Sequence, residues 1–284
     1  MTLRIALDWF VNPDHVPFYA AGLAEQLVIP DDPDAPLRLL ADGAVDLAVN
    51  YQPNVTLARS RGVPVRSVGL LIDAVLDTLM VRADGPVRTV ADLRGRRIAV
   101  AVEPFDRILF AAMAQHAGLP PDSWTVVDVG FEFTAALVEG RVDAVMGAFR
   151  NYEVIEAEER GVAVRVFELA DHGVPPFYQL VLVARDGDAP ARKAAIRETL
   201  GRIASGIDRT RRDPAAAFAA YLGANPGHAD RFHERAFAAT LPAFAASQRQ
   251  DPERWRAFAA FLAARGLIGA APAAADLFTN ELAA

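Results

Sequence analysis

Residues 78–86 of the chain read TLMVRADGP, and residues 179–190 read QLVLVARDGDAP. Each stretch begins as an apolar run and ends in Asp, Gly and Pro, the pattern of a strand that stops at a turn. Between them, strand and helix patterns alternate as a self-contained block. A block entered and left through two extended strands is typical of a lobe inserted into another lobe. We therefore expect a first lobe at 1–84 plus 186–284 and a second lobe at 85–185.

Short apolar runs alternate with amphipathic stretches through residue 185, which indicates the α/β class. About half of the runs are apolar on both faces, which predicts parallel strands covered by helices. The predicted strands are 3–9, 45–50, 66–71, 78–82, 97–102, 125–129, 142–148, 162–167 and 179–185. The predicted helices between them are 16–26, 35–41, 55–61, 105–117, 134–139 and 152–160. From residue 188 on, a helical C-terminal tail is expected, with helices at 191–210, 214–222, 229–241 and 252–266.

Composition narrows the classes of function. The 284 residues carry a net charge of −7, and a negative field repels phosphate backbones, so we expect no nucleic-acid partner. The chain has no cysteine, which excludes disulfides, thiolate metal sites and a cysteine nucleophile. Its five histidines lack metal-ligand spacing, so no metal site is expected.

Hydropathy gives expectations about location. No run approaches 18 apolar residues, so no membrane span is expected. The N-terminus shows no export leader, which predicts a cytoplasmic protein as the sequence is written, or a periplasmic or extracytoplasmic one if a signal was trimmed.

Candidate binding residues come from loops at the carboxyl ends of predicted strands, where α/β folds bind ligands. Trp9, Asn12 and His15 follow the first strand, and Tyr51 follows the second. Trp9 and Tyr51 offer flat faces, and Asn12 offers a donor and an acceptor. The alternatives are that Trp9 belongs to the core and that Asn12 and His15 cap the next helix.

The stretch FRNYE at 149–153 combines a carboxylate with two aromatic rings. The carboxylate of Glu153 could accept two parallel hydrogen bonds from the ring nitrogen and amino group of an aminopyrimidine, with Phe149, Asn151 and Tyr152 beside it. The alternative is that Glu153 only favours the start of a helix.

Three further residues complete the candidate set. Tyr178 follows the stiff pair Pro175-Pro176 and would lie at a rim or begin a buried strand. Glu103 opens a helix without a glycine run, which disfavours a phosphorylated ligand. Asp73 is the third.

Five segments together resemble the thiamine-pyrimidine-precursor family, which comprises ThiY-like substrate-binding proteins of ABC importers and a related fungal pyrimidine synthase. They are LDWFVNPDH (7–15), NYQP (50–53), GAFRNYE (147–153), DHGVP (171–175) and LFTNEL (277–282). The resemblance implies a type II periplasmic-binding-protein fold with two α/β lobes joined by two hinge strands. It also implies a 4-amino-2-methylpyrimidine ligand of the hydroxymethylpyrimidine or formylaminopyrimidine type. Trp9, Asn12 and Tyr51 would line the first lobe, Tyr152 and Glu153 the second, and Tyr178 the rim.

The chain departs from the synthase branch at its chemical residues. Where that branch carries a histidine donor and a lysine for pyridoxal phosphate, this sequence has Asn54 and Asn50. Its cysteine-rich iron motif corresponds to residues 173–178, which hold no cysteine. We therefore expect no cofactor and no catalytic residue. The segment after Gln26 is also shorter than in family members.

The leading hypothesis is a binding protein that traps an aminopyrimidine between lobes that close by hinge motion and hands it to an ABC permease. One alternative is a cytoplasmic pyrimidine-processing enzyme of thiamine biosynthesis on the same scaffold, acting through Asp73, Glu103 or His15. Another is a ligand sensor or chaperone, which would need a protein partner.

Overall fold

The computed structural model describes residues 2–32, 35–100, 102–130, 132–188 and 190–283. The chain forms two compact units, unit 1 at Met1–Val75 with Phe177–Ala284 and unit 2 at Leu76–Pro176. Both boundaries fall before the expected ones at 84/85 and 185/186. The expected bounds place the strand at 78–82 in the first lobe and the strand at 179–185 in the second lobe. Strand pairing instead assigns each to the other unit, so the chain crosses before these strands rather than after them.

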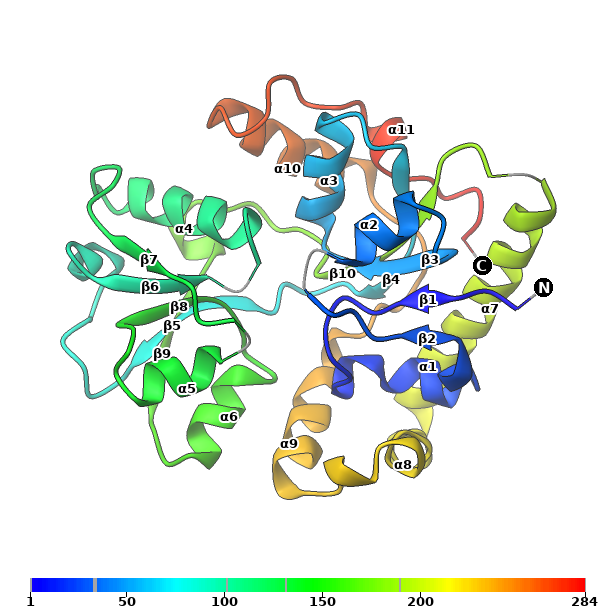
Figure 1. Cartoon of the computed structure of the whole chain (residues 1–284), viewed down its shortest axis with the longest axis horizontal. Coiled ribbons are helices and arrows are strands. Elements are labelled where there is room, and N and C mark those ends of the chain that lie inside the picture. Colours follow the sequence, from blue (N-terminus) through cyan, green and yellow to red (C-terminus); the bar gives the residue numbers. More distant parts are fainter. Residues whose placement is uncertain (1, 33–34, 101, 131, 189, 284) are drawn as a thin grey trace. The chain divides into compact units, whose positions relative to one another are not determined.

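Unit 1 contains a mixed five-stranded sheet (Figure 1). Its strands are β1 (Ile5–Ala6), β2 (Leu27–Val28), β3 (Leu47–Asn50), β4 (Val65–Ile72) and β10 (Leu180–Arg185). The spatial order is β2-β1-β3-β10-β4. Strand β1 pairs in parallel with β2 and β3, whereas β10 runs antiparallel to both of its neighbours. The carboxyl ends of β1 and β3 therefore lie side by side.

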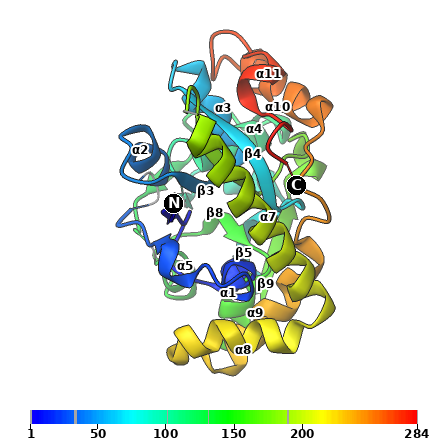
Figure 2. The same cartoon turned by 90° about the vertical axis from the view of Figure 1, so that its right-hand side faces the viewer.

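The helices of unit 1 come from both ends of the chain. They are α1 (Val16–Ala20), α2 (Ala35–Ala41), α3 (Gln52–Ser60), α7 (Pro190–Arg212), α8 (Pro214–Ala224), α9 (Arg231–Thr240), α10 (Pro252–Ala264) and α11 (Ala274–Leu277). The long helix α7 lies across one face of the sheet and packs against α1 and α8 (Figure 2). On the other side, α3 packs against α10 and α11, and the ring of Trp255 stacks on Phe278 in the core.

Unit 2 repeats this architecture on a smaller scale. Its strands are β5 (Asp77–Arg82), β6 (Arg97–Val100), β7 (Thr125–Val127), β8 (Ala144–Phe149) and β9 (Val164–Glu168), in the order β7-β6-β8-β5-β9. Strand β6 is parallel to β7 and β8, while β5 is antiparallel to β8 and β9. Helix α4 (Phe105–His116) covers one face, and α5 (Phe133–Val138) and α6 (Glu153–Glu159) cover the other (Figure 1).

The expectation of parallel strands is wrong for one inner strand of each sheet. Strands β5 and β10 are the first strands that the chain forms after crossing into a unit, and each pairs antiparallel with its neighbours. Both are buried on both faces, so their apolar sequence does not distinguish them from parallel strands. No helix in the described part of the chain is both long and apolar enough to cross a membrane.

Candidate functional site

The loop after β1 is held by its own polar side chains. Asn12 accepts a hydrogen bond from the N–H of Asp14 at 2.8 Å and caps a short 3-10 helix at Pro13–His15. The backbone N–H of Asn12 in turn donates to Nδ1 of His15 at 3.2 Å. Because Nδ1 accepts, the ring proton of a neutral His15 lies on Nε2. The capping alternative for Asn12 and His15 therefore describes what the structure shows.

Asp8 connects this loop to the end of β3. Its Oδ1 atom accepts from Nε2 of His15 at 2.9 Å, and its Oδ2 atom accepts from the hydroxyl of Tyr51 at 3.1 Å. All three side chains are buried, with 2%, 0% and 3% of their surface exposed for Asp8, His15 and Tyr51. The parallel pairing of β1 with β3 brings these two loops together. The structure thus joins two candidates, His15 and Tyr51, through a carboxylate.

Asp8 is the residue that sequence reasoning missed. It directly follows the apolar run at residues 5–7, and a carboxylate directly after a buried strand was the available signal. A second missed residue is Asn54 in the first turn of α3. Its Oδ1 atom is buried and has no hydrogen-bond partner among the described residues. Only the burial of that atom marks it, and the burial of a single polar atom cannot be read from the sequence.

Trp9 lies beside the buried network and leaves little surface open. It is 8% exposed, and its ring centroid lies 5.9 Å from that of Phe10. The face of Trp9 is thus held in a fixed orientation at the carboxyl end of β1.

In unit 2, four candidates lie on one turn of chain between β8 and α6. Glu153 is the first residue of α6, and its Oε2 atom accepts from the N–H of Phe149 at 2.8 Å. Asn151 is buried, while Phe149, Tyr152 and Glu153 are half-buried. The hydrogen bond from Phe149 orients the Glu153 carboxylate at the first turn of α6.

Asp73 and Tyr178 meet around a residue of the helical tail in unit 1. Arg254 forms an ion pair with the carboxylate of Asp73 and also donates to the carbonyl oxygens of Asp73 and Phe177, at 2.7 and 2.6 Å. Its guanidinium carbon lies 4.1 Å from the centroid of the Tyr178 ring. The hydroxyl of Tyr178 accepts from the N–H of Asp251 at 2.7 Å, and the side chain is buried. Both candidates therefore hold chain segments at the edge of unit 1.

Glu103, the remaining candidate of unit 2, follows β6 and forms a surface ion pair. It is exposed, and its carboxylate accepts from Nε of Arg107, one helical turn later, at 2.9 Å. This is an ordinary surface pair of the i,i+4 type.

Comparisons with known proteins agree with this architecture. A solved structure of the periplasmic aliphatic sulphonate binding protein SsuA from Escherichia coli superposes with a TM-score of 0.72. The match covers 96% of this chain and 90% of that chain at 18% identity. The predicted type II periplasmic-binding-protein fold is thereby confirmed.

Sequence similarity is closer to proteins of thiamine metabolism. A thiamine biosynthesis protein of Haemophilus influenzae is 31% identical over 280 residues, which are 94% of this chain and 88% of the relative. A formylaminopyrimidine-binding protein of Halalkalibacterium halodurans is 34% identical over 194 residues, covering 65% of this chain and 59% of the relative. The family model described as NMT1/THI5 like matches residues 12–217, most of the chain. The chain belongs to the NMT1/THI5-like family.

Proposed function

We propose that this protein binds a thiamine pyrimidine precursor of the formylaminopyrimidine or hydroxymethylpyrimidine type and serves as an ABC-transporter-type substrate-binding protein. The observation that carries the proposal is the 34% identity to a formylaminopyrimidine-binding protein. Fold supports it too, since the sulphonate-binding relative is a periplasmic binding protein of the same architecture.

In unit 1, the flat side chain of Trp9 is the proposed stacking surface for the pyrimidine ring. Stacking needs a ring whose orientation is fixed before the ligand arrives, because ordering a free side chain costs free energy. The contact with Phe10 and the hydrogen bonds of the loop at 8–15 support that role. Tyr51 belongs to the same network, and its hydroxyl is committed to Asp8.

In unit 2, Glu153 is the proposed acceptor for the amino group and protonated ring nitrogen of an aminopyrimidine. Its carboxylate is already oriented by the N–H of Phe149, and the two oxygens of a carboxylate have the geometry to accept from two parallel donors. Charge assistance makes such a pair roughly twice as strong as one between neutral groups. Tyr152, half-buried beside it, is the proposed ring contact in this unit.

Delivery of the ligand to a permease is part of the proposal. This part of the proposal rests on the likeness in fold to a periplasmic binding protein and not on a surface of this chain. A permease and ATPase encoded beside the gene would support it, and reconstituted uptake that depends on this protein would test it.

The binding proposal is tested by calorimetry on the purified protein. Formylaminopyrimidine and hydroxymethylpyrimidine are the probes, and an aliphatic sulphonate is the control ligand. We expect one pyrimidine to bind per chain and the sulphonate not to bind. Binding of the sulphonate alone, or of no probe, would overturn the proposal. Mass spectrometry of the recovered probe checks for catalysis, since a chemically altered pyrimidine would show an enzyme instead.

A further inference from the structure

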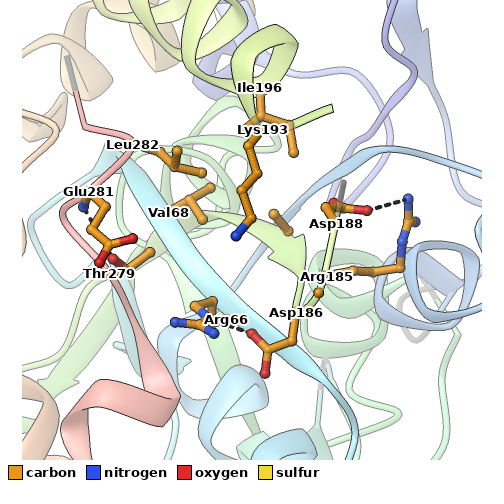
Figure 3. A pocket seen from close by; sticks show the side chains of 12 residues that line it. Arg66, Val68, Arg185, Asp186, Asp188, Lys193, Ile196, Thr279, Glu281 and Leu282 are labelled. Carbon is orange, nitrogen blue, oxygen red and sulfur yellow. Dashed lines mark hydrogen bonds and ion pairs between the residues drawn. The ribbon is translucent and has the colours of Figure 1, made fainter. Parts of the chain in front are cut away.

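A pocket in unit 1 is built from the end of β10, the start of β4, the first turns of α7 and the C-terminal segment (Figure 3). Its volume is about 120 Å³. Pockets for drug-sized ligands span roughly 300–1,000 Å³, so this pocket suits a molecule of only a few heavy atoms. Its apolar lining comes from Val68, Ile196 and Leu282, which are almost fully buried.

Most charges around this pocket are already paired. Arg66 forms an ion pair with Asp186, which Arg59 also contacts. Burial alone would raise the pKa of Asp186, but hydrogen bonds and charge from Arg66 and Arg59 lower it overall. Arg185 donates to the carbonyl oxygens of Leu40 and Val45, both at 2.7 Å, so its guanidinium is held in place. The side chains of Arg66, Asp186 and Arg185 are therefore held in place by ion pairs and hydrogen bonds within unit 1.

Lys193 is different from the other cations that line the pocket. It is the only lysine of the chain. Its side chain extends from α7 toward the pocket (Figure 3), and it forms no ion pair within the described ranges of the chain. A compact ammonium on a flexible stem can therefore meet an incoming carboxylate without breaking an existing contact.

Asp188 offers the opposite charge. Its side chain is 9% exposed, and only its Oδ1 atom is within ion-pair distance of Arg185 and Arg192, at 3.6 Å from each. Its Oδ2 atom is buried and has no hydrogen-bond partner among the residues described. Burial raises the pKa of Asp188, and Arg185 and Lys193 offset only part of that rise. A buried carboxylate oxygen without a donor is costly, so a ligand that supplies one gains free energy.

We propose that this pocket binds a small zwitterion of the α-amino acid class. The ligand carboxylate pairs with Lys193, the ligand ammonium donates to Oδ2 of Asp188, and a short aliphatic side chain contacts Val68, Ile196 and Leu282. A simple anion would leave Asp188 unsatisfied, and a simple cation would leave Lys193 unpaired. The zwitterion satisfies both groups and adds no net charge to the pocket.

The single lysine makes the test specific. Reductive methylation with ¹³C-formaldehyde keeps the positive charge and gives one dimethyl-lysine NMR signal, assigned by its absence in Lys193→Arg. The α-amino signal serves as an internal control. L-alanine is the probe, with sodium acetate and ethylammonium chloride as arms that carry one charge each. We expect a saturable shift of the Lys193 signal with L-alanine and a dissociation constant of about 1 mM, because partly exposed ion pairs are weak.

Variants separate binding from general perturbation. Asp188→Asn is expected to weaken L-alanine binding by about tenfold, because it removes the charge that faces the ammonium. Glu198→Gln, an exposed position on the same helix, is the matched control and should leave binding unchanged. Because Asp188 also lies within ion-pair distance of Arg185, Asp188→Asn changes more than the proposed ligand contact. Calorimetry on Lys193→Gln provides a second measurement that leaves Asp188 and Arg185 unchanged, and we expect loss of L-alanine binding in this variant.

Three results would overturn the proposal. One is no shift of the Lys193 signal at about 20 mM L-alanine, far above the expected dissociation constant. Another is an equal shift with sodium acetate, which would show an anion site only. The third is unchanged L-alanine affinity in Lys193→Gln.

Discussion

Nε2 of His15 lies 2.9 Å from Oδ1 of Asp8, and both side chains are buried in unit 1. Nδ1 of the same ring accepts from the N–H of Asn12, so Nε2 is the donor to Asp8. The hydroxyl of Tyr51 donates to the other oxygen of Asp8. Both carboxylate oxygens are therefore satisfied by donors from two different loops, and the network fixes the backbone around Trp9.

Replacing Asp8 by asparagine is expected to destabilise the protein. The new amide keeps the shape but presents N–H groups to one of two buried donors, so either His15 or Tyr51 loses its acceptor. Breaking a buried, hydrogen-bonded pair costs about 3 kcal/mol of the free energy of unfolding. Urea denaturation measures the change. Asp42→Asn, at an exposed position, is the control and should stay within about 0.5 kcal/mol of wild type. Equal denaturation midpoints for Asp8→Asn and wild type would disprove the role given to Asp8.

Glu153→Gln is expected to weaken binding of the proposed aminopyrimidine by about 10- to 100-fold. Glutamine retains a carbonyl oxygen that can accept from the N–H of Phe149, so the start of α6 stays intact. What disappears is the negative charge that faces the protonated ring edge, a difference of about 1.5–3 kcal/mol. Calorimetry with formylaminopyrimidine measures the loss. Glu156→Gln on the same helix, where Glu156 pairs with Arg160, is the matched control. An unchanged affinity in Glu153→Gln would remove this carboxylate from the site.

The close packing of α1 against α7 predicts opposite effects of two alanine substitutions on one helix. A Cβ atom at Gly206 would lie 2.2 Å from the carbonyl oxygen of Pro17 and 2.9 Å from Cβ of Ala21. Since neither neighbour can move freely, Gly206→Ala should cost about 2 kcal/mol of the free energy of unfolding. A Cβ atom at Gly201 would have no neighbour within 4 Å among the described residues, so Gly201→Ala should add up to about 1 kcal/mol through helix propensity. Thermal unfolding of both variants measures these changes in stability. A Gly206→Ala protein as stable as wild type would contradict the close packing of α1 against α7.

The sequence predicted the order of secondary structure well, because buried strands and amphipathic helices differ in hydrophobic period. Helix α2 has the bounds that were expected for it, and each of the nine predicted strands overlaps an observed one. Strand β2 was not predicted. It has two residues, both half-buried, so it carries too little of a period-2 pattern to be recognised.

Strand direction and side-chain partners could not be predicted in the same way. Strand β10 is as apolar as a parallel strand, and only its partners β3 and β4 reveal that it runs antiparallel. The contacts of Tyr178 depend on Arg254 and Asp251, which are more than seventy residues away in sequence. The role of Asp8 cannot be predicted from the sequence because it depends on a hydrogen bond from Tyr51. That hydrogen bond forms only when β1 and β3 pair. Local patterns hold no information about such partners.

The helical part of unit 1 contains two stacked histidines that predict a loss of stability in mild acid. The ring centroids of His228 and His233 lie 4.0 Å apart, and the two rings are nearly parallel. Asp230 is hydrogen-bonded to His233, and the hydroxyl of Tyr221 is hydrogen-bonded to His228. Burial lowers the pKa of His228 below its ordinary value of 6.5, the charge of His233 lowers it further, and Asp230 opposes both. The folded protein thus binds fewer protons at this site than the unfolded chain does, and stability falls as the pH drops from about 6.5 through the folded pKa.

Thermal unfolding between about pH 7.5 and pH 5 measures this effect. In His228→Gln the side chain no longer titrates, so its melting temperature should fall less steeply with decreasing pH than that of wild type. His116→Gln, at an exposed histidine of unit 2, is the control and should keep the wild-type slope. Because many carboxylates also titrate near the lower end of this range, the difference in slope between about pH 7 and pH 6 is the informative quantity. Parallel curves for His228→Gln and wild type in that interval would show that protonation of His228 does not destabilise the fold.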